Sequence, residues 1–183
     1  MFDIRKIQEQ SLYEAVKAES DETTAKEIVF GKEKQTEEAD SDWVKSSMHR
    51  LEHKFDSKVI KNIRMKCQCH YGMEEKIALL KELKESSTTI EELAANKKAA
   101  AAGLFCKGNE LFLQFNHCPC PILMNVDILE TSSWCQCTTG YSKYLFETAF
   151  ACHVDVELLQ SIKMGNPICL MKIILHHPVW LTD

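Results

Sequence analysis

Three features are missing from this sequence, and each absence makes one class of protein unexpected. No run of 18 apolar residues occurs, so no membrane-spanning helix is expected. Residues 1–6 lack the apolar stretch of a secretory signal peptide. Basic residues are not in excess, because 22 Lys and Arg stand against 27 Asp and Glu, for a net charge of -5. Without a basic stripe to neutralise phosphates, we expect no nucleic-acid partner. Because the sequence shows no signal peptide and no membrane-spanning run, we expect a cytoplasmic protein.

Cysteine, by contrast, is abundant, since the 183 residues include nine. In a reducing cytoplasm, thiols are expected rather than disulfides, with roles as metal ligands, as a catalytic nucleophile or as small buried side chains. Six of the nine occur as Cys-X-Cys pairs, a spacing that core packing gives no reason to produce. The pairs are Cys67/Cys69, Cys118/Cys120 and Cys135/Cys137, while Cys106, Cys152 and Cys169 stand alone.

The first half of the chain has the apolar periodicity of helices. Residues 1–40 are predicted to form an N-terminal helical extension, ended by Gly31, and a charged linker. From Val44 to Ile63, apolar residues recur at spacings of three and four, which predicts one helix of about six turns with its N-cap at Ser41 or Asp42. Further helices are expected as far as residue 103, so the region 41–103 is predicted to be helical.

After Gly103 the pattern changes to that of strands. The predicted elements are a hairpin over 104–115, a strand near 122–129, a helix over 141–150 capped by Thr138 or Thr139, and strands over 153–159 and 168–175. The sheet region therefore spans 104–177, within a single domain over 41–183. The expected fold class is α+β, with N-terminal helices followed by an antiparallel sheet that has one inserted helix.

The cysteine pairs have the chemistry of a metal site. In extended backbone, the two side chains of a Cys-X-Cys pair point the same way, so both thiolates can bind one soft ion at a Zn–S distance of about 2.3 Å. The prolines of Cys118-Pro119-Cys120-Pro121 favour that extended geometry. Four thiolates satisfy a structural zinc ion, and an iron–sulfur cluster is the alternative. The first-choice ligands are Cys118, Cys120, Cys135 and Cys137.

The other features of the pairs concern how easily a thiolate forms. Cys135 and Cys137 are expected just before a helix, whose N-terminus favours negative charge and lowers the pKa of a thiol. Cys67 and Cys69 follow a helix and lie beside Arg64, Lys66 and His70, and the cations among these favour thiolates. Cys67, Cys69 and His70 are therefore the next choice of metal ligands.

The C-terminal half resembles a known family. The segments that carry the resemblance are Trp134–Tyr141, Leu145–Glu147, Val154–Ile162 and Gly165–Cys169, within a match over residues 104 to 175. They look like the L-2-amino-thiazoline-4-carboxylate hydrolase-like family and the related 4-vinyl-reductase-like domain. The resemblance implies an α+β domain that binds a small-molecule ligand at a cysteine-based site, with zinc as a possible metal. The family-like residues are Cys135, Cys137, Glu157 and Cys169.

Three functions are compatible with these patterns. The leading hypothesis is a protein that binds zinc or a small ligand through the Cys-X-Cys pairs. The alternative is a cysteine-dependent hydrolase of a small cyclic or amide substrate, in which Cys135 or Cys137 attacks, His70 or His117 acts as base, and Glu157 orients the base. In the third, the cysteines have a structural role, and the helix predicted over 42–63 supplies an apolar face for a homodimer.

Overall fold

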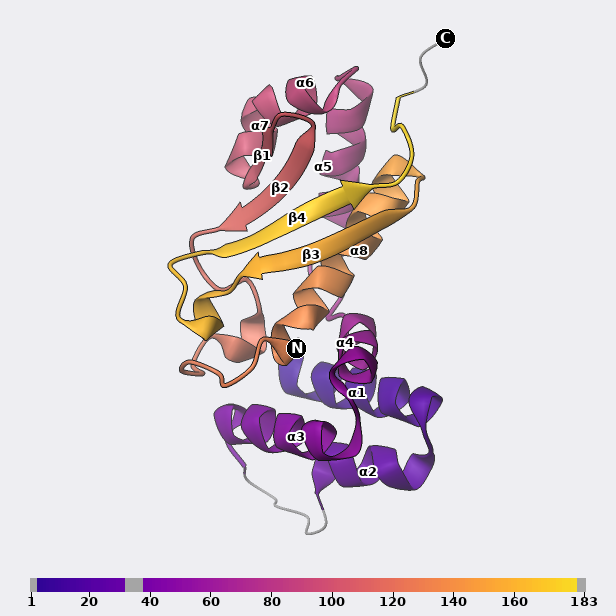
Figure 1. The fold of residues 1–183 in the computed structure, drawn as a ribbon, viewed down its shortest axis with the longest axis vertical. Coiled ribbons are helices and arrows are strands. Elements are labelled where there is room, and N and C mark those ends of the chain that lie inside the picture. Colours follow the sequence, from indigo (N-terminus) through magenta and orange to yellow (C-terminus); the bar gives the residue numbers. More distant parts are fainter. Residues whose placement is uncertain (1–2, 32–37, 181–183) are drawn as a thin grey trace. The chain divides into compact units, whose positions relative to one another are not determined.

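The protein has an α+β fold in a computed structural model that describes residues 3–31 and 38–180 (Figure 1). Two compact units divide the chain. The first is built from Met1–Cys69, Cys118–Gly140 and Lys163–Gly165, and the second from His70–His117, Tyr141–Ile162 and Asn166–Asp183. This division differs from the expected extension over 1–40 and domain over 41–183, because the helices on both sides of residue 40 pack in the same unit.

The first unit is built around four helices, α1 (Ile4–Glu19), α2 (Glu22–Phe30), α3 (Asp40–Lys54) and α4 (Ser57–Lys66). Three of them begin at an aspartate whose carboxylate accepts a hydrogen bond from a backbone N–H of the first turn: Asp3 caps α1, Asp21 caps α2 and Asp56 caps α4. Their apolar faces form a core with Trp43 and Trp134, whose rings meet edge to face at 5.3 Å. No helix of the described residues is long and apolar enough to cross a membrane.

The single long helix predicted over 44–63 is wrong, since α3 and α4 are separate. Phe55 has an extended backbone, and the Asp56 carboxylate accepts a hydrogen bond from the Val59 N–H at 2.9 Å, which starts a new helix. The apolar spacing continues across this break, and therefore concealed it. The predicted N-cap at Ser41 or Asp42 is also wrong, because α3 begins at Asp40 and its N-cap makes no side-chain hydrogen bond.

The segment predicted as a strand near 122–129 contains no strand. It begins with a short 3-10 helix, η1 (Pro121–Leu123), with a proline at its first position, where no backbone N–H is needed. Ile122 and Leu123 are buried in the core of the first unit. The Leu129 N–H donates to the Lys163 carbonyl at 2.7 Å, which ties the segment to residues 163–165 of the same unit.

The second unit contains the sheet, with strands in the order β1-β2-β4-β3 and every pair antiparallel (Figure 1). The strands are β1 (Leu104–Lys107), β2 (Glu110–Phe115), β3 (Val154–Gln160) and β4 (Cys169–Leu175). The 104–115 hairpin and the two later strands are therefore confirmed. Helices α5 (Met73–Glu85), α6 (Ile90–Ala95) and α7 (Lys97–Ala101) precede the sheet. Side chains of α5, of the second half of α8 and of the strands share one core, which includes Leu83, Phe146 and Met171.

The helix expected over 141–150 begins earlier than predicted. Helix α8 runs from Gln136 to Phe150 and follows a 3-10 turn, η2 (Ser133–Cys135). Cys135 and Cys137 are therefore in helical backbone, and the extended geometry proposed for Cys-X-Cys pairs does not apply to them. Thr138 and Thr139 lie inside the first turn instead of capping it, and the Thr139 hydroxyl donates to the Gln136 carbonyl at 2.8 Å.

Candidate functional site

All three Cys-X-Cys pairs belong to the first unit. Each pair contributes a buried thiol from a different place in the chain: Cys67 ends α4, Cys120 precedes η1, and Cys137 lies in the first turn of α8. Electrostatic interactions link Cys137 to both of the other thiols. The convergence of these three segments, which the sequence could not reveal, brings one cysteine of each pair into a single cluster.

A completely buried arginine lies beside this cluster. The Nη2 atom of Arg64 donates to Gln8 Oε1 at 3.2 Å and to the Trp134 carbonyl at 3.4 Å, and the guanidinium lies 3.8 Å from the Trp134 ring centroid. Its Nε and Nη1 atoms have no hydrogen-bond partner, and no carboxylate of the described residues forms an ion pair with it. Because arginine stays charged in proteins and a buried charge is costly, this guanidinium needs a nearby anion.

The anion that the geometry provides is the thiolate of Cys137. The Cys120 thiol donates a hydrogen bond to Cys137, and this bond lowers the pKa of Cys137 to about 6, although burial acts in the opposite direction. The positive charge of Arg64 and a hydrogen bond from Thr138 lower that pKa further. The same bond to Cys137, together with burial, raises the pKa of Cys120 well above the usual range of thiols. The hydrogen bond between the two sulfur atoms therefore favours the thiolate at Cys137 over the thiolate at Cys120.

Cys67 is the third member of the cluster and is in the thiol form. Burial raises its pKa to about 11, and the positive charge of Arg64 opposes this shift only in part. Its Sγ donates to the Ile63 carbonyl at 3.2 Å, and its backbone carbonyl accepts from Gln8 Nε2 at 2.9 Å. Gln8 thus contacts both Arg64 and Cys67, which fixes the end of α4 against α1.

Gly140, three residues after Cys137, has a packing role in the same unit. A Cβ atom at Gly140 would lie 2.0 Å from the Met65 carbonyl oxygen, so only glycine allows α8 to approach the end of α4 this closely. Gln68 Nε2 bridges the two segments, since it donates to the Gly140 carbonyl at 3.1 Å and to the Met65 carbonyl at 3.2 Å. This close approach places the first turn of α8, with Cys137, beside Cys67.

The other predicted site residues are distributed between the two units. Cys118 is half-buried and interacts electrostatically with Cys120, Cys135 is buried at the end of η2, and Cys69 is half-buried after α4. The second unit contains His70, whose Nδ1 lies 3.3 Å from Met73 Sδ, and also His117, Glu157 and Cys169. Glu157 is exposed on β3, and its register partner is Lys172.

Compact groups of metal ligands are rare in this protein. Within residues 3–31 and 38–180, a single group of three or more Cys, His, Asp or Glu ligand atoms lies within 4.8 Å of one another, and it consists of His153, Asp155 and His176. It belongs to the second unit and contains no cysteine. No sequence motif joins these three residues, because His176 lies more than 20 residues from its two partners.

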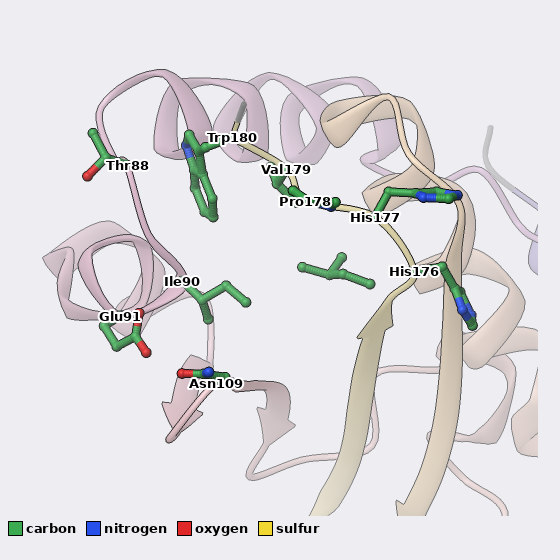
Figure 2. Close-up of a pocket in the computed structure, with 10 residues that line it drawn as sticks. Thr88, Ile90, Glu91, Asn109, His176, His177, Pro178, Val179 and Trp180 are labelled. Carbon is green, nitrogen blue, oxygen red and sulfur yellow. The ribbon is translucent and has the colours of Figure 1, made fainter. Parts of the chain in front are cut away.

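The second unit also has a pocket of about 490 Å³ (Figure 2). Ile90, Val179 and Trp180 supply apolar walls, and Glu91 and Asn109 supply polar groups at one side. The indole of Trp180 is held in place, because its Nε1 donates to the Lys84 carbonyl at 3.0 Å. No motif in the sequence indicated this pocket, because its lining comes from α6, the β1–β2 turn and the segment after β4.

A model of a family of unknown function, DUF6144, matches residues 1–180. The chain belongs to this family. No curated protein sequence matches the DUF6144 chain. Among solved structures, the DUF6144 fold is similar to a trafficking protein particle complex subunit 3 from Naegleria fowleri covalently bound to palmitic acid, at 15% sequence identity and a TM-score of 0.42. That likeness covers 74% of the DUF6144 chain and 90% of the subunit.

Proposed function

We propose that this DUF6144 protein binds a soft metal ion, zinc in the first place, through the thiols of Cys67, Cys120 and Cys137. The supporting observation is that Cys120 and Cys137 share a hydrogen bond and that Cys67 interacts electrostatically with Cys137. The three sulfur atoms are not all within 4.8 Å of one another in this structure, so their side chains must move closer together to bind one ion. A proton shared by two sulfur atoms occupies the place where a soft cation binds two thiolates. Metal binding then displaces the protons of Cys67 and Cys120, whose raised pKa values keep them protonated in the metal-free protein.

The buried guanidinium supports the same proposal through charge. One zinc ion, three thiolates and the guanidinium of Arg64 sum to zero, so the loaded site is neutral as a whole. Neutrality matters because each uncompensated buried charge destabilises the folded protein by about 5 kcal/mol. The thiols are also almost inaccessible, since Cys67 is 0% exposed and Cys120 and Cys137 are each 7% exposed. An ion can enter such a site with smaller rearrangements than an organic substrate requires.

The coordination of the proposed site and the identity of its metal depend on whether Cys118 takes part. Three protein ligands leave a zinc ion with an open position for water or a small ligand. A fourth thiolate from Cys118, which already interacts with Cys120, makes a closed structural site instead. Four thiolates also satisfy an iron–sulfur cluster, so iron is the alternative metal.

Metal content tests the proposal directly. The full chain, purified without a tag under reducing and anaerobic conditions, is analysed for zinc and iron by inductively coupled plasma mass spectrometry. We expect the zinc content to fall by about one ion per chain when Cys120→Ser and Cys137→Ser are combined. The matched control combines Cys106→Ser and Cys152→Ser, two half-buried thiols of the second unit, and should keep the metal. Metal-free wild-type protein that also takes up no zinc on titration would contradict the proposal.

A second candidate is the cysteine-dependent hydrolase, favoured by the position of Cys137 in the first turn of α8 beside Arg64. A thiolate at neutral pH is a nucleophile, and the two unpartnered nitrogens of the guanidinium suit an anionic group such as a carboxylate. The resemblance to the L-2-amino-thiazoline-4-carboxylate hydrolase-like family supports this candidate. Its predicted partners His70, His117 and Glu157 belong to the second unit, and Cys120 is a hydrogen-bond partner of Cys137 within the first unit.

Mass spectrometry after treatment with a small electrophile tests the hydrolase. Chloroacetamide applied at neutral pH should modify Cys137 before the other eight cysteines, and Cys137→Ser should abolish that modification and any turnover of a thiazoline substrate. Uniform modification of all exposed thiols, with Cys137 untouched, would remove this candidate and leave the metal proposal standing.

A further inference from the structure

Two histidines are brought side by side at one end of the sheet. His153 precedes β3 and His176 follows β4, and the adjoining residues Val154 and Leu175 are register partners in the antiparallel pair. The backbone N–H of His176 donates to the His153 carbonyl at 3.1 Å, which adds one hydrogen bond beyond the end of the β3–β4 pair. As a result, the two imidazole rings stack with their centroids 4.7 Å apart and an interplanar angle of 23°.

A carboxylate completes this pair as a group of three metal ligands. Asp155 lies on β3, two residues after His153, and its side chain is therefore on the same face of the sheet. Its Oδ2 lies 2.8 Å from His176 Nε2, and one ligand atom from each of the three residues lies within 4.8 Å of the other two. Two ligands of one zinc ion are at most about 4.2 Å apart, so small side-chain movements suffice to bring all three onto one ion.

A second carboxylate orients one of the histidines. The Oε1 atom of Glu147, on α8, lies 3.1 Å from His153 Nδ1 and also accepts from the Val154 N–H at 3.2 Å. Histidines that bind metals nearly always donate their other ring N–H to a carboxylate or a carbonyl in this way. When Nδ1 is engaged by Glu147, the lone pair of His153 is on Nε2, which is the atom left for the metal.

The charges around the group favour a divalent cation. Lys143 lies 3.0 Å from Asp155 Oδ1 and 3.6 Å from Glu147 Oε1, so it fixes both carboxylates while leaving Asp155 Oδ2 to His176. The two carboxylates and the one lysine of this group sum to a formal charge of -1, which attracts a cation.

We propose that His153, Asp155 and His176 form a zinc-binding site at the surface of the second unit, with Glu147 as the residue that positions His153. Two imidazoles and one carboxylate are a ligand set that zinc binds with a fourth position open. His176 also belongs to the lining of the 490 Å³ pocket, but its ring points away from the wall formed by Ile90, Val179 and Trp180 (Figure 2). The ion is therefore bound next to the pocket and outside its apolar part.

Titration with zinc chloride in a calorimeter tests this site when the full-length, metal-free chain carries Cys120→Ser and Cys137→Ser, which remove the cysteine cluster. We expect His153→Ala and His176→Ala each to weaken binding at least tenfold, and Glu147→Gln to weaken it by about tenfold through loss of orientation. His177→Ala is the matched control, because His177 neighbours His176 in sequence but does not belong to the group. Circular dichroism verifies that the exposed variants remain folded. Equal affinities in this background with and without the His153 and His176 substitutions would overturn the proposal.

Cobalt spectra separate this site from the cysteine cluster, so the two proposals can fail independently. Cobalt bound by thiolates absorbs strongly in the near ultraviolet through charge transfer from sulfur, whereas nitrogen and oxygen ligands give only weak visible bands. In the Cys120→Ser, Cys137→Ser chain, we expect visible cobalt bands without the charge-transfer band, and we expect His176→Ala to abolish them. If the only cobalt signal is the charge-transfer band and the histidine variants leave it unchanged, the histidine site is refuted while the cysteine proposal stands.

Discussion

The guanidinium of Arg64 lies 3.8 Å from the ring centroid of Trp134, and both side chains are completely buried. A cation over the face of an indole gains about 2 kcal/mol when both are desolvated, which is less than the several kcal/mol that burial of the charge costs. The Cys137 thiolate supplies the remaining compensation. The burial of Arg64 therefore depends on both Trp134 and Cys137, and the pKa of Cys137 is a measure of its interaction with Arg64.

Replacement of the cation should raise the pKa of Cys137. In the wild type, we expect one thiolate to titrate near the pKa of about 6 of Cys137. Arg64→Met keeps most of the side-chain volume but removes the charge, so the midpoint should move towards the ordinary range of thiols, about 8.5. The ultraviolet absorbance of the thiolate, followed against pH in metal-free protein, measures this midpoint. Arg64→Lys keeps a charge and should show a smaller shift, and equal midpoints in all three proteins would contradict the assignment.

The stability of the metal-free protein should rise with pH between about 6 and 9. The pKa of Cys137 is lowered from 9.0 to about 6 in the folded chain, so its contribution is complete above pH 9 and is lost as the pH falls through 6. Cys67 behaves in the opposite way, because its pKa is raised to about 11, and its contribution is lost as the pH rises from 9 through 11. Denaturant unfolding at a series of pH values measures both the rise in stability between about pH 6 and 9 and the fall between about pH 9 and 11.

A single substitution tests whether Cys137 causes the rise in stability between pH 6 and 9. Cys137→Ser should flatten the dependence between pH 6 and 9, whereas Cys106→Ser in β1 should leave it unchanged. An unchanged slope in the Cys137 variant would show that another group carries the pH dependence.

Gly140→Ala should destabilise the protein, although alanine is the better helix former. In an open helix position the exchange stabilises by about 1 kcal/mol. At Gly140 the added methyl lies 2.0 Å from the Met65 carbonyl oxygen, so α8 and the end of α4 must separate, at a cost of about 3 kcal/mol. Gly108→Ala is the control, because no atom lies within 4 Å of its added methyl and only its φ of 55° opposes the change. Thermal or denaturant unfolding compares the two, and a neutral Gly140 variant would refute the close approach.

Asp56→Ala should weaken α4, the helix that ends at the cysteine cluster. The Asp56 carboxylate accepts from the Val59 N–H at 2.9 Å, and loss of such a cap costs about 1 kcal/mol. Asp56→Asn retains the acceptor and should be close to the wild type in denaturant unfolding. Lys58→Ala, at an exposed position of the same turn, is a second control, and an equal loss in that variant would mean that capping is not the cause.

Local chemistry predicted the parts of this fold that local interactions decide. The residues over 104–115 predicted the hairpin of β1 and β2. Helices were likewise predicted before residue 103, where the Thr89 side chain starts α6 by accepting from the Glu92 N–H. The strand predicted at 122–129 failed for the opposite reason. Ile122 and Leu123 are apolar because they fill the core of the first unit, and an apolar run of that length does not distinguish a strand from a buried turn.

The sequence by itself determined that the chain is α+β and that cysteines occur in three close pairs, because periodicity and spacing are local properties. Only the tertiary structure decided which thiols meet. Cys67, Cys120 and Cys137 come from three segments, and Arg64 and Cys137 are 73 positions apart. Burial removes water from between them, so the Arg64 guanidinium and the Cys120 thiol lower the pKa of Cys137. The same holds for His153 and His176, which lie beside each other because β3 and β4 pair in one register, a choice made by the core beneath the sheet.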